Sequence, residues 1–133
     1  MMNRKKSSVD FSFFVNQKVK MILVDDDRSL TVCFPNGRLV VECSWRISSD
    51  KGILYGSSDV VVLGLKKLKK LLEKKVVVNI HHYQHVSDLI IEFNDQTYLE
   101  LFHNSSYYEG WELIGEGGFH VVSLPGGSYA EFD

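Results

Sequence analysis

No lysine or arginine occurs after Lys75, although the rest of this 133-residue chain holds nine carboxylates and all five histidines. Residues 1–75 carry all fifteen basic side chains and only eight acidic ones. The formal net charge of −2 therefore hides a basic first part and an acidic second part. Such a partition bears on partners and association rather than on the fold.

Long apolar runs and a disulfide framework are also absent. The two cysteines, Cys33 and Cys43, are too few for the disulfide framework of a small secreted domain. No run approaches the ~18 apolar residues of a membrane span. The apolar stretch 11–15 is interrupted by Ser12 and is shorter than the core of a secretory signal. We therefore expect a cytoplasmic protein that does not associate with a membrane.

The length of the chain is typical of one domain that buries its own apolar core. The apolar fraction of 44% is ordinary for a globular protein. We expect a single domain over residues 1–133, in which residues 1–14 are a candidate flexible N-terminal segment.

The clearest structural signal is an internal repeat between residues 17–46 and residues 76–103, at an offset of 59 positions. Within it, SLTVCFPNGRLVVEC matches DLIIEFNDQTYLELF. In both segments apolar and polar residues alternate, which is typical of half-buried strands, and a turn sequence interrupts the alternation. Each copy is therefore predicted to form a β-meander of three antiparallel strands.

The turns of the two copies differ. Asn36-Gly37 predicts a two-residue hairpin turn, because both positions of that turn favour positive φ, and it would place Cys33 opposite Val40. The second copy has Asn94-Asp95-Gln96, whose weaker turn chemistry indicates a longer loop. After the turn the apolar positions of the two copies are one residue out of step, and a bulge near Gly37 would reconcile them.

Between the copies, the sequence GLKKLKKLLEKK over residues 64–75 has leucines at helical spacing among lysines, which predicts an amphipathic helix. We expect its leucines to pack across a sheet and its lysines to face water. After the second copy, glycine-rich turns at residues 115–118 and 125–127 predict a hairpin and a last short strand. The predicted fold is α+β and mostly antiparallel β: two repeated β-meanders separated by one amphipathic helix, plus a C-terminal β-hairpin.

The C-terminal segment carries a family resemblance. It reads Tyr108-Glu109-Gly110-Trp111-Glu112-Leu113, then a glycine-rich turn, then Leu124-Pro125-Gly126-Gly127. Together with the strand-turn sequences Phe34-Pro35-Asn36-Gly37 and Phe93-Asn94-Asp95-Gln96, it resembles a family of small bacterial proteins known as a domain of unknown function and suspected to be of the toxin-immunity type. The resemblance covers residues 15–133, with Gln96 departing from the glycine of the family turn. It implies a protein that neutralises a cognate toxin by binding it, and it supplies no catalytic residues.

The acidic second part supplies the candidate partner-binding residues. Glutamates there alternate with apolar strand positions, aromatic side chains lie among them, and complementary charge would accelerate binding to a basic partner. Solvated strand surface is the alternative interpretation of the same carboxylates. The candidate contacts for a protein partner, such as a basic toxin domain, are Glu92, Glu100, Tyr108, Glu109, Trp111 and Glu112.

Three histidines in five positions invite a metal-site interpretation, since imidazole is a common ligand of transition metals. They are His81, His82 and His85. The repeat places them in a strand, where His81 and His85 would face one side about 13 Å apart and His82 would face the other. This spacing disfavours a metal site, so we interpret the segment as a polar strand edge and expect no metal and no cofactor.

Six lysines within residues 66–75 could attract phosphate backbones. Arginine, which makes bidentate contacts to guanine, is missing from this segment, so nucleic acid is disfavoured as a partner. Neither a phosphate-binding glycine loop nor a GxSxG nucleophile motif occurs, and we expect no catalytic residue. The leading hypothesis is a small cytoplasmic binding protein of the immunity type. A metal-binding protein or enzyme at the histidines, and a module that self-associates through its basic helix and acidic strands, are the alternatives.

Overall fold

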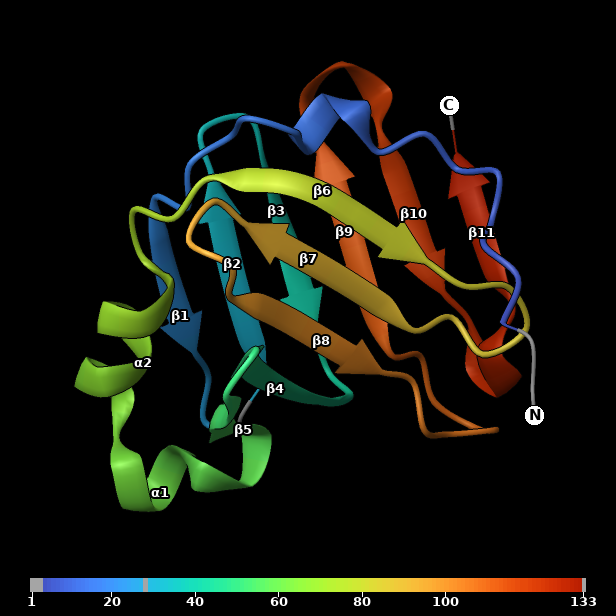
Figure 1. Ribbon diagram of the computed structural model, residues 1–133. Helices are drawn as coiled ribbons and strands as arrows, with labels where there is room; N and C mark the ends of the chain where they lie inside the picture. The colour runs from blue at the N-terminus through green and yellow to red at the C-terminus, as the bar shows by residue number, and fades with distance from the viewer. Residues whose placement is uncertain (1–3, 28, 133) are drawn as a thin grey trace.

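The computed structural model describes residues 4–27 and 29–132, and these form a sandwich of two antiparallel sheets (Figure 1). The six-stranded sheet has the order β1-β2-β3-β9-β10-β11, and the five-stranded sheet has the order β5-β4-β8-β7-β6. The predicted α+β class, dominated by antiparallel strands, is confirmed. The strands are β1 (Met21–Val24), β2 (Leu30–Phe34), β3 (Gly37–Val41), β4 (Ser44–Ser49), β5 (Gly52–Gly56), β6 (Val77–His82), β7 (Leu89–Phe93), β8 (Tyr98–Phe102), β9 (Trp111–Gly115), β10 (His120–Ser123) and β11 (Tyr129–Phe132).

Helical segments are short and connect the strands. In residues 4–27 and 29–132, two of them are α-helical: α1 (Val60–Leu63) and α2 (Leu65–Leu72). Gly64 separates them with a φ of 83°, a value that L-residues with side chains rarely adopt. Single 3₁₀ turns lie at η1 (Ser12–Phe14), η2 (Ser57–Asp59), η3 (Glu116–Gly118) and η4 (Pro125–Gly127).

The sequence repeat corresponds to two β-meanders, one in each sheet. The first copy forms β1-β2-β3 in the six-stranded sheet, and the second forms β6-β7-β8 in the five-stranded sheet. Equivalent apolar positions of the copies face the common core, where they are almost completely buried: Leu30, Val32 and Phe34 from β2, and Leu89, Ile91 and Phe93 from β7. The two layers therefore pack the same side-chain pattern against each other.

Each meander is extended by a strand that follows the other meander in sequence. β4 leaves the first meander and pairs with β8, so that Trp45 lies opposite Leu101. β9 leaves the second meander and pairs with β3, so that Trp111 lies opposite Val41. This exchange interlocks the halves of the chain in one sandwich. The hairpin of β4 and β5 is an element that the sequence analysis did not identify.

The predicted Asn36-Gly37 turn was wrong. Phe34 pairs with Gly37, so the loop residues are Pro35 and Asn36, and Cys33 lies opposite Arg38 rather than Val40. Gly37 is instead required by close packing. A Cβ there would collide with the carbonyl oxygen of Ile114 and would lie 2.9 Å from the ring of Phe14.

The second turn explains why the copies are out of step. The backbone N–H of Phe93 donates to the carbonyl of Thr97 at 2.9 Å, which closes a loop of three residues in place of two. The third, Gln96, has a φ of 64°. The extra residue lies in this turn, and β2 and β3 pair without a bulge near Gly37.

The basic helix packs beside a strand edge, not across a sheet as expected. Leu68 and Leu72 of α2 are fully buried, whereas Leu65 is 39% exposed. Each buried leucine contributes about 1.5–3 kcal/mol of transfer free energy. After α2, the carboxylate of Glu73 accepts the outward-facing backbone N–H of Ile22 on β1 at 3.1 Å. This hydrogen bond satisfies a backbone amide at the edge of the six-stranded sheet, and that amide is therefore less available for pairing with a strand of another chain.

Residues 4–20 run along the edge of β6 and belong to the packed structure. The N–H of Ser7 donates to the carbonyl of His82 at 2.8 Å, and the N–H of Asn16 donates to the carbonyl of Val77 at 2.7 Å. Phe11 and Phe14 enter the core and are 6% and 0% exposed. Among residues 4–27 and 29–132, each helix is too short or too polar to span a lipid bilayer.

Candidate functional site

The predicted partner-binding carboxylates do not share one surface. Glu92 on β7 and Glu100 on β8 alternate with buried residues and project from the outer face of the five-stranded sheet. Glu112 on β9 projects from the outer face of the six-stranded sheet. The outer faces of a sandwich point away from each other, so one flat partner cannot cover all three carboxylates.

These carboxylates also have partners within the chain. Glu100 accepts hydrogen bonds from Nε of Arg46 at 2.6 Å and from the hydroxyl of Ser48 at 2.8 Å. Burial raises the pKa of Glu100, but these hydrogen bonds outweigh it and the net pKa is lowered. Glu112 lies 2.5 Å from Nε2 of His120. Paired carboxylates are less available for attracting a basic partner.

Trp111, another predicted contact, is a core residue. It is 1% exposed, and its indole Nε1–H donates to the carbonyl of Ser87 at 2.8 Å. The His82 ring approaches it edge-on, with ring centroids 5.3 Å apart. A partner cannot reach this side chain in the folded structure, and its contribution is to packing.

Tyr108 and Glu109 lie in the exposed loop that joins β8 to β9. Tyr107 and Tyr108 are 78% and 70% exposed, and Glu109 is exposed beside them. The loop is nevertheless tied down, because the hydroxyl oxygen of Ser105 accepts the backbone N–H groups of both tyrosines at 3.0 and 2.9 Å. Two aromatic rings held outside the core in this way are well placed for a partner, because less conformational entropy is lost on binding.

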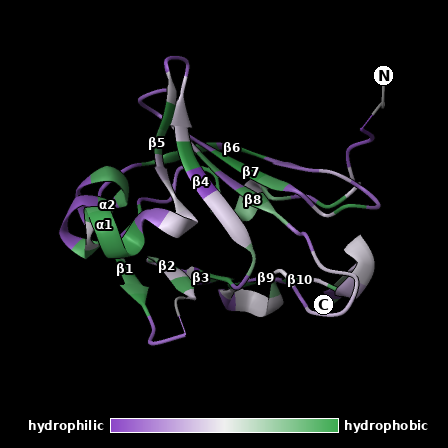
Figure 2. Cartoon of the chain, turned by 90° about the horizontal axis from the view of Figure 1, so that it is seen from below, coloured by the Kyte–Doolittle hydropathy of each residue, from purple (hydrophilic) through white to green (hydrophobic). Residues whose placement is uncertain are grey.

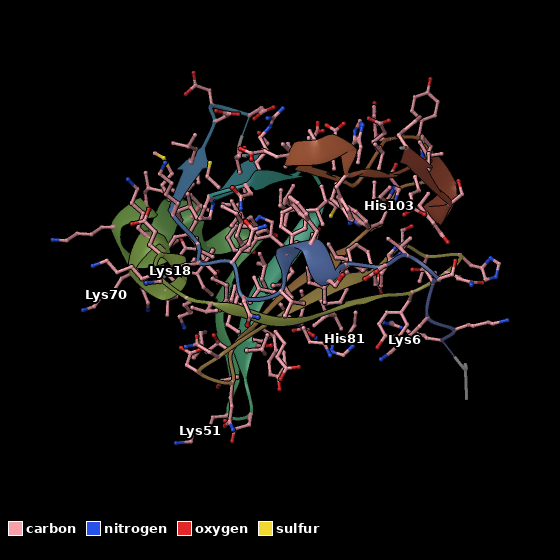
Figure 3. The ribbon with its side chains drawn as sticks, turned by 90° about the horizontal axis from the view of Figure 1, so that it is seen from above. Lys6, Lys18, Lys51, Lys70, His81 and His103 are labelled. Carbon is pink, nitrogen blue, oxygen red and sulfur yellow. The ribbon has the colours of Figure 1, made fainter. Side chains whose placement is uncertain are left out.

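The three candidate metal ligands do not converge. His81 projects outward, where its Nδ1 lies 3.1 Å from the amino group of Lys6 (Figure 3). His82 points inward and is 2% exposed, and burial lowers its pKa to about 4. His85 is exposed beyond the end of β6, with a φ of 72°. Within the described ranges no three His, Cys, Asp or Glu side chains are arranged to hold a metal ion.

A serine–histidine pair that the sequence did not reveal joins His103 to Ser123. Nε2 of His103 lies 2.8 Å from the carbonyl oxygen of Tyr108, which can only accept, so Nε2 carries the proton and Nδ1 accepts from the Ser123 hydroxyl. In the Ser-His-Asp arrangement that activates a nucleophilic serine, Nε2 accepts the serine proton and Nδ1 is protonated, which is the opposite tautomer. Ser123 is also fully buried, so its hydroxyl cannot reach a substrate and the pair anchors the loop instead.

The structure reveals a polar hollow at the end of the sandwich, where β1, β3 and β8 end. Its volume is about 330 Å³. It is lined by Asp27, Ser29, Glu42, Cys43, Ser44, Trp45, Ser57 and Asn104. The chain reaches this hollow by four separate connections, which follow β1, β3, β5 and β8, so sequence proximity could not assemble it. The acidic run Asp25-Asp26-Asp27 is the feature of the sequence that could have indicated the hollow. It was overlooked because it lies in residues 1–75, where basic residues predominate.

The hollow is acidic and prepared to receive a cation. Asp27 accepts the backbone N–H of Ser29 at 3.0 Å and its hydroxyl at 2.8 Å, and these bonds lower the pKa of Asp27. Glu42 is exposed at the rim. Burial raises the pKa of the Cys43 thiol to about 12, so the thiol stays protonated and is a poor nucleophile. Carboxylates beside neutral hydroxyl and amide groups suit the ammonium or guanidinium group of a partner side chain.

The hollow and the tyrosine loop lie at the same end of the sandwich, here called the acidic end and defined as Asp25, Asp26, Asp27, Glu42, Asn104, Tyr107, Tyr108 and Glu109. The N–H of Glu42 donates to the carbonyl of Gly110 at 2.9 Å, which fixes the loop beside the hollow. Figure 1 shows the β1–β2, β3–β4 and β8–β9 connections at the same end of the sandwich. In comparisons with protein-family models, curated proteins and solved structures, no match to this chain is found.

Proposed function

We propose that this chain is a small cytoplasmic binding protein of the immunity type, which neutralises a cognate bacterial toxin by direct contact through its acidic end. The observation that carries the proposal is that the acidic hollow and the exposed Tyr107–Tyr108 pair lie at the same end of the sandwich, where the bond from Glu42 to Gly110 ties the tyrosine loop to the rim of the hollow. Aromatic anchors beside a charged pocket are typical of interface hot spots. The sequence resemblance to suspected immunity proteins supports the same function.

In the proposed complex, a lysine or arginine of the toxin enters the hollow between Asp27 and Glu42. The tyrosine rings cover apolar surface beside it, while Glu109 adds charge at the rim. Because this end of the protein is acidic and toxins that attack nucleic acid are commonly basic, opposite potentials accelerate the encounter. Covering the toxin's substrate-binding surface would be sufficient for neutralisation, without catalysis by this chain.

The test begins with the product of the gene adjacent to its own as the candidate toxin. Co-expression is expected to protect cells from that product, and the purified proteins are expected to form a complex in isothermal titration calorimetry. The association rate should fall as salt is raised from about 50 to 500 mM, since screening shortens the reach of the charges. Toxicity that is unchanged by co-expression, with no complex in vitro, would contradict the proposal.

Variants locate the binding surface. Glu42→Gln and the pair Tyr107→Ala with Tyr108→Ala alter exposed side chains and should leave the fold intact, while weakening the complex by about 10- to 100-fold each. The matched controls are Glu92→Gln and Glu100→Gln on the five-stranded sheet, where binding should change by less than about threefold. Weakening by the controls but not by Glu42→Gln would move the interface to the outer face of that sheet and refute the acidic end.

A further inference from the structure

The outer face of the six-stranded sheet is unusually apolar for a face that meets water. The register places one row of outward side chains across all six strands: Met21, Cys33, Arg38, Ile114, His120 and Phe132. The neighbouring row consists of Leu23, Thr31, Val40, Glu112, Val122 and Ala130. A solvated face of an antiparallel sheet normally carries polar residues, whereas most of these are apolar.

Several apolar side chains of this face, hereafter the apolar face, lie in the open. Met21, Leu23 and Phe132 are 40%, 45% and 51% exposed. Figure 2 shows α1 and α2 at one side of the sandwich, so that neither helix covers this face in the described part of the chain. The face is also hollowed by about 450 Å³ between Lys20, Met21, Arg38 and Ile114. Met21, Leu23 and Phe132 lie on the two edge strands, and half-buried Val40 and Ile114 lie between them. Exposed apolar side chains on a sheet face mark interaction sites, and methionine and aromatic residues are enriched there.

Charge divides the apolar face in the same way as it divides the sequence. Lys20 and Arg38 lie on the half formed by β1–β3, and both line the hollow. The half formed by β9–β11 carries Glu112, and Glu116 follows β9 at the rim of the hollow. This half lies wholly after Lys75 and therefore contains no lysine or arginine. One face thus offers a basic and an acidic half side by side.

We propose that the apolar face binds the same face of a second copy of this chain, related by a two-fold axis that runs parallel to the strands between β3 and β9. That axis lays β1–β3 of each copy over β9–β11 of the other, so opposite charges meet twice. Phe132 of the second copy then lies over Met21 beside the hollow. Near the axis, Arg38 of each copy faces Glu116 of the other. Self-complementary contacts of this kind are what an isologous dimer requires.

The size of the face sets the expected strength of the dimer. Six strands about 4.8 Å apart, each about five residues long, form a rectangle of roughly 29 by 16 Å. Such a patch is smaller than the ~800 Å² per partner of standard stable interfaces. We therefore expect a reversible dimer that dissociates in the micromolar range, and one that leaves the acidic end free to bind another protein.

Analytical ultracentrifugation of the full chain between about 1 and 500 μM is the test. The mass should rise from 15.2 kDa toward twice that value as concentration increases. Leu23→Glu and Phe132→Glu change exposed side chains, so the variants should fold, and each should weaken dimerisation by at least about tenfold. The matched controls are Ile53→Glu and Val62→Glu, whose side chains are 63% and 84% exposed on β5 and α1 and should leave the dimer unchanged.

A charge reversal tests the proposed orientation. Arg38→Glu alone and Glu116→Arg alone should each weaken the dimer about tenfold, because each leaves two like-charged contacts at the axis. The double variant exchanges the charges and should restore dimerisation to within about threefold of the wild type. A protein that stays monomeric at 500 μM, a dimer broken by the control variants instead, or single variants without effect would overturn the proposal.

Discussion

The two sheets are alike on the faces that meet in the core and unlike on the faces that point outward. Inside, Trp45 and Trp111 occupy equivalent places on the exchanged strands β4 and β9, each next to the end of the other copy's meander. Outside, the five-stranded sheet carries Glu92, Glu100 and Arg46, while the six-stranded sheet carries mostly apolar side chains. The shared inner pattern specifies the sandwich, and the divergent outer faces are where separate functions can reside.

The largest effect is expected from removing the two tryptophans. Trp111→Ala and Trp45→Ala should each lower the free energy of unfolding by about 3–5 kcal/mol, since both side chains are almost completely buried. Urea unfolding followed by circular dichroism measures both. If either substitution lowered the free energy of unfolding by less than about 1 kcal/mol, the two tryptophans would not have equivalent roles in the core.

Phenylalanine in place of each tryptophan separates packing from hydrogen bonding. Trp111→Phe removes the donor to the buried carbonyl of Ser87 and should cost about 1–3 kcal/mol in addition to the lost volume. Trp45 is held by stacking on Tyr55, with rings 5.8 Å apart, and Phe preserves an aromatic ring there. We expect Trp45→Phe to be the milder change, and the reverse order would show that the hydrogen bond contributes little.

The next effect compares the inner and outer histidines of β6. Because burial holds the pKa of His82 at about 4, the folded state keeps it neutral while the unfolded chain binds a proton below the ordinary value of 6.5. Neutral His82 therefore contributes its full stabilisation above pH 6.5, and this contribution is lost as the pH falls from 6.5 toward 4. Between pH 7 and pH 5 the wild type should lose about 2 kcal/mol from this group.

His82→Phe should flatten this pH dependence, although it also removes the contact with the Ser7 hydroxyl at 2.7 Å. The control is His81→Gln on the outer face, which retains His82 and should keep the wild-type slope. Asp88, whose pKa is raised by burial, has the opposite proton linkage and is present in both variants. Denaturant unfolding at several pH values provides the measurement, and equal slopes in the wild type and His82→Phe would contradict the assignment.

Much of the fold was accessible from the sequence because its signals are local. The alternation around Leu30–Phe34 and Leu89–Phe93, and the glycine-rich turn after Trp111, predicted strands and hairpins that the structure contains. The turn at Pro35-Asn36 was misread, since Gly37 follows from contact with Ile114 on β9, which lies far away in sequence. Local propensity could not reveal a requirement imposed by a distant strand.

The candidate site was harder to predict for the same reason. The exchange of β4 and β9 brings Asp27, Glu42 and Asn104 together, although they lie on three connections. The outward charges of the second copy were visible in the sequence, but their partners were not, as with Arg46 and Glu100. Alternation identified Glu100 as outward-facing, and only the pairing of β4 with β8 showed that it is already engaged.

A smaller effect should distinguish the glutamates of the two outer faces. Glu100 is 15% exposed and bonded to Arg46 and Ser48, so Glu100→Gln should cost about 1–2 kcal/mol. Glu112 is 37% exposed beside His120, and Glu112→Gln should stay within about 0.5 kcal/mol of the wild type at pH 7. If thermal and urea unfolding showed the same loss of stability for Glu100→Gln and Glu112→Gln, the two outer faces would not differ in this respect.

The smallest expected effect compares the turns of the two meanders. Gln96 adopts a φ of 64°, where a side chain strains the backbone and glycine does not, so Gln96→Gly should stabilise the protein by about 0.5 kcal/mol despite the greater freedom of the unfolded chain. Asn36 in the first turn does not have a positive φ, so glycine relieves no strain there. Asn36→Gly only raises the conformational entropy of the unfolded chain, and should not stabilise the protein. Opposite signs for the two substitutions in urea unfolding would show that the meanders share a pattern but close it with different turns. Stabilisation by Asn36→Gly would instead indicate that the first turn is strained as well.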